Sequence, residues 1–89
     1  MAWTIEYAET AKKQLRKLDK AAARRIADFM DKRIGAGDAP LQLGKALQGP
    51  LGNFWCYRVD DFRMICDIQD RVLTVLVLQI GNRREVYRR

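Results

Sequence analysis

The strongest constraint on the fold is an apolar, β-branched run near the C-terminal end of the chain, Val72-Leu73-Thr74-Val75-Leu76-Val77-Leu78. A run of this kind has no polar face, which is typical of a strand covered on both sides of a sheet. We therefore expect a buried central strand over Arg71–Ile80. The rest of the chain has to supply neighbouring strands and a layer that covers them.

Three shorter segments have the features of neighbouring strands. Trp3, Ile5 and Tyr7 alternate with polar residues, the period-2 pattern of a half-buried strand. Asn53–Val59 and Phe62–Gln69 are separated only by Asp60-Asp61, which predicts a hairpin. The preceding segment, from Leu41 to Gly52, has the composition of an irregular loop that feeds this hairpin.

Two stretches between the first strand and that loop have a helical period. Ala11, Leu15 and Leu18 form an apolar stripe among basic residues, and Asp19-Lys20 interrupts it. A second helix is expected from about Lys20 to Ile34, with a stripe of Ala22, Ile26, Phe29, Met30 and Ile34, and a segment rich in glycine ends it. The order β-α-α-β-β-β predicts one α+β domain over residues 1–89, with a helical hairpin on one face of a small, mainly antiparallel sheet. We expect the many basic residues of the helices to be mainly a solvated surface.

The hairpin fixes which side chains share a face. A two-residue loop at Asp60-Asp61 places Val59 opposite Phe62, Arg58 opposite Arg63, Tyr57 opposite Met64, Cys56 opposite Ile65 and Trp55 opposite Cys66. The face with the aromatic side chains should receive the helices. Cys56 and Cys66 then point to opposite sides of the sheet, so both are expected to be thiols.

The predicted register also brings two like charges together. Cβ atoms in a directly opposed pair lie about 5 Å apart, and Arg58 opposite Arg63 is destabilising unless an anion lies between or above them. A phosphate would satisfy the pair. The alternative is that each arginine pairs with Asp60, Asp61 or Asp67, or that the loop is longer and the register slips.

Composition favours an anionic partner and excludes several kinds of chemistry. The 89 residues include 17 Lys and Arg against 11 Asp and Glu, a net charge of +6, which suits nucleic acid, an acidic protein or a membrane surface, although basic residues also simply solvate small domains. There is no histidine, and the two cysteines lack zinc spacing, so we expect neither a metal nor a cofactor. No signal peptide or membrane span is recognisable, which predicts a cytoplasmic protein.

The last nine residues, Gly81-Asn82-Arg83-Arg84-Glu85-Val86-Tyr87-Arg88-Arg89, follow directly on the apolar run. Four arginines and a tyrosine after a buried strand place planar, permanently charged phosphate ligands where a core offers them no partner. A charged, solvated chain end is the alternative.

These features together resemble the RelE-like branch of the RelE/ParE superfamily of toxins from type II toxin–antitoxin systems. The resemblance covers nearly the whole chain. It depends on the element order, the basic first helix, Lys45-Ala46-Leu47-Gln48-Gly49, Trp55-Cys56-Tyr57-Arg58-Val59-Asp60-Asp61-Phe62-Arg63, and Ile80-Gly81-Asn82-Arg83-Arg84-Glu85-Val86-Tyr87.

The resemblance implies a RelE-like microbial RNase fold and a metal-independent endoribonuclease that cuts mRNA on the ribosome and inhibits translation. By position, Arg63 would clamp the scissile phosphate, Arg83 would serve the leaving group, Tyr87 would stack on or orient the nucleotide, and Arg58 would hold phosphate. Lys45, Arg84 and Arg88 are candidate phosphate or RNA ligands, with a surface-loop lysine and a charged terminus as the alternatives. The implied partners are the ribosome, mRNA and a RelB-like antitoxin whose C-terminal segment wraps the toxin.

Cys56 departs from this family pattern, because a basic residue is common at that position. The general base therefore stays open between a tyrosine, a thiol of lowered pKa, and orientation by the ribosome itself. Two other functions compete with the nuclease: poisoning of DNA gyrase, as in the ParE branch, and non-catalytic RNA binding through a basic surface.

Overall fold

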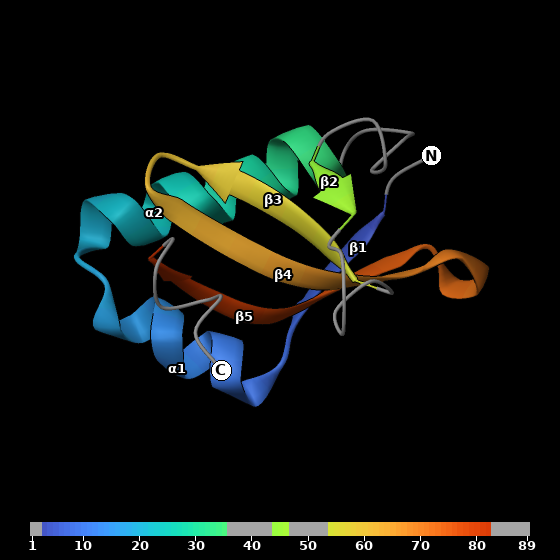
Figure 1. The fold of residues 1–89 in the computed structure, drawn as a ribbon, viewed down its shortest axis with the longest axis horizontal. Helices are drawn as coiled ribbons and strands as arrows, with labels where there is room; N and C mark the ends of the chain where they lie inside the picture. Colours follow the sequence, from blue (N-terminus) through green and yellow to red (C-terminus); the bar gives the residue numbers. More distant parts are fainter. Residues whose placement is uncertain (1–2, 36–43, 47–53, 83–89) are drawn as a thin grey trace.

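The structure is a computed structural model, and it describes residues 3–35, 44–46 and 54–82. In chain order, the described elements are β1 (Thr4–Tyr7), α1 (Glu9–Lys17), α2 (Lys20–Asp28), the π-helical segment η1 (Phe29–Gly35), β2 (Lys45–Ala46), β3 (Trp55–Val59), β4 (Phe62–Gln69), the 3-10 turn η4 (Asp70–Val72) and β5 (Thr74–Asn82). The two helices lie on one side of a curved sheet (Figure 1). This arrangement confirms the expected α+β fold.

The sheet has the strand order β1-β5-β4-β3-β2. β1 runs parallel to β5, and the other neighbouring pairs are antiparallel. The sheet is therefore mainly antiparallel, as expected. β5 is an interior strand, but the middle strand of the five is β4.

The loop expected between Leu41 and Gly52 contains a short strand that the sequence analysis missed. Lys45 and Ala46 pair with Cys56 and Trp55 on β3. Gly44 allows the two strands to approach each other because it has no Cβ atom; a Cβ at this position would lie 2.5 Å from the carbonyl oxygen of Cys56. Its φ of 81° also favours glycine. Two residues are too few to show the alternation by which strands are recognised.

The second helix changes its winding near its end. At its N-terminus, the side chain of Asp19 caps the helix by accepting a hydrogen bond from the backbone N–H of Ala22 at 3.3 Å. The α-helical winding ends at Asp28. The remaining turn, Phe29–Gly35, is π-helical. The predicted helix therefore exists, but its last seven residues are wound more widely.

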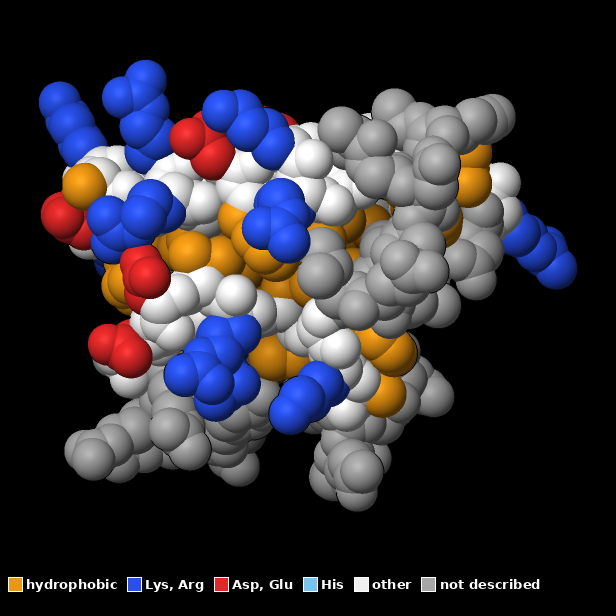
Figure 2. Space-filling view, turned by 90° about the horizontal axis from the view of Figure 1, so that it is seen from above, with side chains coloured by type: hydrophobic (Ala, Val, Ile, Leu, Met, Phe, Trp, Pro, Cys, Tyr) orange, Lys and Arg blue, Asp and Glu red, His pale blue; other side chains and the backbone are white. Residues whose placement is uncertain are grey.

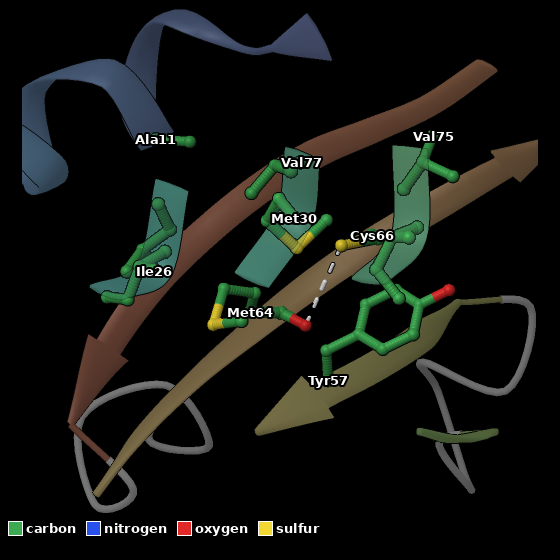
Figure 3. Close-up of a cluster of buried hydrophobic side chains, with 10 residues drawn as sticks. Ala11, Ile26, Met30, Tyr57, Met64, Cys66, Val75 and Val77 are labelled. Atoms are coloured by element: carbon green, nitrogen blue, oxygen red, sulfur yellow. Dashed lines mark hydrogen bonds between the residues drawn. The ribbon is translucent and has the colours of Figure 1, made fainter. Parts of the chain in front are cut away.

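The core lies between this helical layer and the sheet (Figure 3). Both predicted helical stripes face it, and the buried members are Ala11, Ala22, Ile26, Met30 and Ile34. From the sheet, the fully buried side chains are Tyr57, Met64, Cys66, Val75 and Val77, with Ile80 1% exposed. Trp55, Val59 and Phe62 pack against this cluster, which confirms the predicted core face of the hairpin.

β5 differs from its predicted range at both ends. It begins only at Thr74, because Asp70–Val72 form a 3-10 turn and Leu73 has a φ of 48°. At its other end, the strand extends past Ile80 to Asn82. Val72 is consequently 63% exposed and Leu73 37% exposed, although both were expected inside the buried strand. The register also shifts between Ile65 and Cys66, so that Val75, Val77 and Ile80 all contribute to the core.

The cysteines behave as predicted. Cys56 and Cys66 are buried on opposite faces of the hairpin and form no disulfide. No helix within the described ranges has the length and apolar composition needed to cross a membrane.

Candidate phosphate-binding site

The candidate site begins at the tight turn between β3 and β4. Asp60 and Asp61 form this turn, and Asp60 has a φ of 55°, the left-handed region that aspartate tolerates better than most residues. The pairing of Val59 with Phe62 closes the turn. The register predicted from a two-residue loop is therefore confirmed at every pair of the hairpin.

Arg58 and Arg63 are directly opposite each other across the two strands. Their chain neighbours Tyr57 and Met64 point into the core, so both arginines belong to the sheet face that is turned away from the helices. Arg58 is exposed and Arg63 is partly buried. Two arginines at directly opposed positions concentrate positive charge on this sheet face, and an anion would stabilise it.

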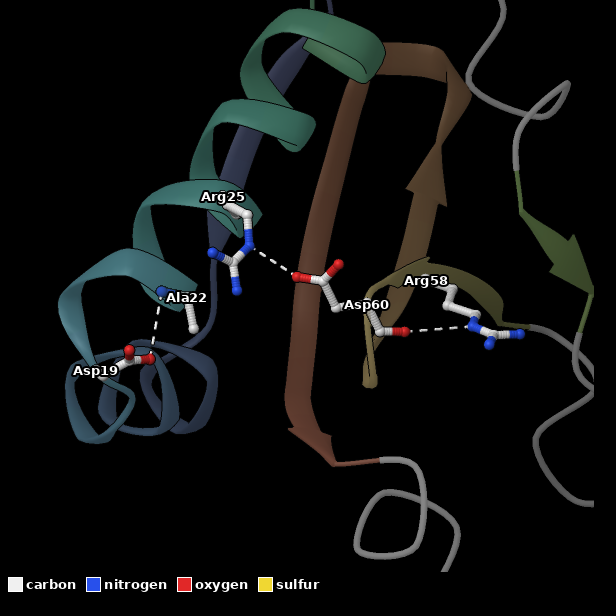
Figure 4. A network of polar contacts seen from close by, with 5 residues as sticks. All are labelled: Asp19, Ala22, Arg25, Arg58 and Asp60. Carbon is white, nitrogen blue, oxygen red and sulfur yellow. Dashed lines mark hydrogen bonds and ion pairs between the residues drawn. The ribbon is translucent and has the colours of Figure 1, made fainter.

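A backbone carbonyl group of the turn accepts a hydrogen bond from the side chain of Arg58. The Nε of Arg58 donates to the carbonyl oxygen of Asp60 at 3.4 Å. The carboxylate of Asp60 is engaged elsewhere, because its Oδ2 accepts from the Nε of Arg25 on α2 at 2.7 Å (Figure 4). Within the described ranges, Arg58 makes no ion pair with a carboxylate. The alternative of a slipped register is wrong, because the strands pair as a two-residue loop predicts. The Asp60 carboxylate binds Arg25 and does not neutralise Arg58.

An open groove of about 850 Å³ lies at this end of the sheet. Its lining residues are Arg25, Arg58, Asp60, Asp61, Phe62 and Asn82. The groove therefore brings together the hairpin turn, one helix and the end of β5. Basic side chains are spread over the face shown in Figure 2, with acidic ones between some of them.

β5 leads to the same end of the hairpin. Gly81 pairs with Arg63, and Asn82, the last residue of β5, pairs with Phe62. Arg83, Arg84, Tyr87 and Arg88 lie outside the described residues, so their convergence with Arg58 and Arg63 stays a prediction. The structure nevertheless shows that β5 ends beside the arginine pair.

Lys45 is the remaining candidate ligand in the described chain. It is exposed on β2 and pairs with Cys56, so it shares a sheet face with Arg58 and Arg63. Cys56 is only 6% exposed, and its thiol donates to the carbonyl of Tyr57 at 3.6 Å. A nucleophilic role for Cys56 is not supported by this buried position.

The buried acids near the core are poor general bases. Burial raises the pKa of Tyr7 to about 12, with smaller contributions from Asp31 and Cys66. Burial also raises the pKa of Tyr57 and of the Cys66 thiol, which are both fully buried. All three groups stay protonated at neutral pH. None of these three groups therefore suits the role of general base, and the choice among another tyrosine, a thiol of lowered pKa and orientation by the ribosome stays open.

Sequence reasoning missed Arg25 and Asn82. Arg25 was assigned to the solvated helical surface, and no local pattern indicates that it reaches a turn 35 residues away. Asn82 was part of the charged tail in the sequence, whereas it ends a strand in the structure. A longer prediction for the last strand would have placed Asn82 beside the turn.

The fold and this basic site define a small α+β protein with an open, arginine-lined groove at one end of its sheet. A family model described as "ParE toxin of type II toxin-antitoxin system, parDE" matches residues 5–87. The chain therefore belongs to this family of type II toxins, within the RelE/ParE superfamily.

Individual relatives agree with this assignment. Toxin RelG of Mycobacterium tuberculosis (strain ATCC 25618 / H37Rv) is 29% identical over 92 residues, which cover 100% of both chains. Among solved structures, the toxin–antitoxin complex RelBE2 of Mycobacterium tuberculosis has a chain with a TM-score of 0.85 and 25% identity, covering 93% of this chain and 100% of that one. The archaeal RelE–RelB complex of Pyrococcus horikoshii OT3 gives a TM-score of 0.73 at 23% identity, with 93% and 97% of the two chains covered, and shows the shared fold.

Proposed function

We propose that this protein is a cytoplasmic toxin, a single domain over residues 1–89, that cuts mRNA on the ribosome without a metal. The observation that carries the proposal is the opposed pair of Arg58 and Arg63 on the sheet face away from the helices, beside the end of β5. Membership of a type II toxin family supports a toxic activity. Two arginines directly opposite each other on one sheet face support a phosphate substrate, because guanidinium groups bind phosphate well.

The proposed reaction is an internal phosphoryl transfer. The ribose 2′-oxygen forms a bond to the adjacent phosphorus while the bond from phosphorus to the 5′-oxygen breaks; the 2′-hydroxyl loses a proton, and the 5′-oxygen gains one. Arg63 and Arg58 would hold the non-bridging oxygens and stabilise the developing charge. Arg83 would serve the leaving oxygen, and Tyr87 would stack on or orient the nucleotide. Lys45, Arg84 and Arg88 would bind the flanking RNA backbone.

The proposed partner is an acidic, RelB-like antitoxin. Two of the similar solved structures are complexes of a toxin with its antitoxin. A basic protein with a net charge of +6 suits a partner whose acidic segment wraps it. We expect the antitoxin to be encoded by an adjacent gene, and a toxin gene without such a neighbour would count against this assignment.

Poisoning of DNA gyrase is the second candidate function. It is favoured by the matched family model, whose description names the ParE toxin. The arginine pair favours the nuclease instead, because a gyrase poison does no chemistry on a phosphate of RNA. A non-catalytic RNA-binding role is a third outcome, which would show strong salt dependence and no product.

One experiment separates the three functions. The purified protein is incubated with translating ribosomes, and the message ends are mapped; in parallel, gyrase supercoils a plasmid in its presence. New message ends that disappear with Arg63→Ala support the nuclease, with Arg24→Ala as the exposed control. Intact message with blocked supercoiling supports the gyrase poison. Intact message with normal supercoiling and RNA binding supports the binding module.

A further inference from the structure

Asp60 contacts two arginines, each with a different chemical group. Its carboxylate accepts from Arg25 at 2.7 Å, and its backbone carbonyl accepts from Arg58 at 3.4 Å (Figure 4). Arg25 reaches the turn from α2, whereas Arg58 belongs to the adjoining strand. The side chain of Asp60 is therefore held toward the helix and away from the strand.

The direction of this carboxylate matters for Arg58. Asp60 lies two residues from Arg58 in the sequence, and both line the same groove. A carboxylate near Arg58 would compete for the planar fork of donors with which a guanidinium binds phosphate. An ion pair with Arg58 would also remove the net charge that attracts the ligand.

We propose that Arg25 is a positioning residue: it holds the Asp60 carboxylate on α2 and so leaves Arg58 available to a phosphate group of RNA. This inference rests on the proposed function for its substrate. The side chains of Arg25 and Asp60 are 56% and 52% exposed, so their ion pair is weak. Loss of Arg25 therefore shifts the preference of Asp60 toward Arg58 and does not abolish the site.

A purely structural role for the ion pair predicts a different pattern of effects. If Arg25 and Asp60 only fasten α2 to the hairpin turn, removing either partner is equally harmful, and removing both is no better. If Arg25 sequesters a competing carboxylate, the carboxylate itself is the source of harm. Neutralising Asp60 then rescues the loss of Arg25.

The test compares Arg25→Ala, Asp60→Asn and the double variant in single-turnover cleavage on ribosomes. Asparagine is tolerated at positive φ, so Asp60→Asn keeps the turn, and thermal melting checks the fold. We expect Arg25→Ala to slow cleavage ~3- to 5-fold, the scale of one exposed ion pair. Asp60→Asn and the double variant should both stay within about twofold of wild type.

Two further variants act as controls. Arg25→Lys keeps the positive charge and should restore most of the rate, whereas Arg24→Ala removes a neighbouring exposed charge and should leave the rate constant at saturation unchanged. A double variant as slow as Arg25→Ala, or an Asp60→Asn variant that is equally slow, would overturn the proposal.

A second measurement does not depend on the nuclease. The Nε–Hε signal of Arg58 in nitrogen-15 NMR spectra is titrated with inorganic phosphate. We expect the apparent dissociation constant to rise ~3- to 5-fold in Arg25→Ala and to return to the wild-type value in the double variant. An unresponsive Arg58 signal, or equal constants in all variants, would refute the positioning role. Absence of cleavage by the wild type together with the expected NMR pattern would refute only the proposed function.

Discussion

The side chain of Gln14 on α1 accepts a hydrogen bond from the backbone N–H of Ile80 on β5, at 2.6 Å. The pairing of β1 with β5 begins at Thr74 and ends at Val77. Ile80 therefore lies on β5 beyond the end of the neighbouring strand β1. Gln14 thus takes the place of a strand at this edge. It fastens α1 to the part of β5 that ends beside Arg58 and Arg63.

Replacing Gln14 with alanine should destabilise this edge. The N–H of Ile80 would lose its partner in a partly buried position, which costs about 1 kcal/mol in free energy of unfolding. Denaturant unfolding measures the change, and hydrogen exchange should be faster at Ile80 in particular. Gln14→Glu retains an acceptor and should lose less, and Lys13→Ala serves as the exposed control on the same helix. Unchanged exchange at Ile80 would mean that the hydrogen bond contributes nothing.

The proposed catalytic arginines should act on rate and not on binding. We expect Arg63→Ala and Arg83→Ala each to slow single-turnover cleavage at least ~100-fold, the scale of losing one donor that stabilises transition-state charge. Ribosome binding should change little. Lys12→Ala and Lys13→Ala, on α1, should weaken binding and reduce its salt dependence at unchanged cleavage rate. Rates within a few fold of wild type for both arginine variants would exclude this mechanism.

Tyr7 should make the protein sensitive to alkali. Burial raises its pKa to about 12, from an ordinary value of 10, so between these pH values the unfolded chain releases a proton that the folded chain retains. The free energy of unfolding should therefore fall as pH rises from about 10 to about 12, and it should be unaffected by this group below pH 10. Denaturant unfolding at several pH values measures the fall.

The Tyr7→Phe variant provides the matched control for the alkaline loss. It should be less sensitive to pH in that range. The Tyr7 hydroxyl is buried and has no hydrogen-bond partner in the described part of the chain, so its removal should not destabilise the fold at neutral pH. A Tyr7→Phe variant that is clearly less stable at pH 7 would show that the hydroxyl makes a favourable contact.

Gly44→Ala should release β2 from β3. The added Cβ would lie 2.5 Å from the carbonyl oxygen of Cys56 and 2.8 Å from the indole Nε1 of Trp55, at a backbone φ of 81°. Strain of this kind costs about 1–3 kcal/mol. The fluorescence of Trp55 should change, and hydrogen exchange should rise along β3. Gly35→Ala, whose nearest contacts are at 3.3 Å and whose φ is not positive, should have the smaller effect. Equal effects would indicate that Gly44 is not specially constrained.

The hairpin was predictable because its pattern is local. A two-residue turn and the period of a strand determine which residues face each other, so the sequence alone predicts that Arg58 opposes Arg63. The last strand was harder. The β-bulge at Leu78 moves Ile80 to the core face, and the left-handed backbone at Leu73 excludes Val72 from the strand. Neither feature has a signature in an uninterrupted apolar run.

The contact between Arg25 and Asp60 could not be predicted for a different reason. It depends on how α2 crosses the sheet, which is set by packing of Ile26, Met30 and Ile34 and not by the residues that make the ion pair. Arg24 and Arg25 are both exposed and look equivalent in the sequence. Only the tertiary structure distinguishes the residue that reaches the site.

The parallel pairing of β1 with β5 has a consequence for the timing of folding. Thr4, near the start of the chain, is hydrogen-bonded into the sheet beside Thr74, near its end. A growing chain cannot complete this sheet before Thr74–Asn82 have been synthesised, because the strand that pairs with β1 is β5. The Gln14 contact to Ile80 has to wait as well. The strand order thus makes the completion of the sheet depend on residues that are synthesised long after β1.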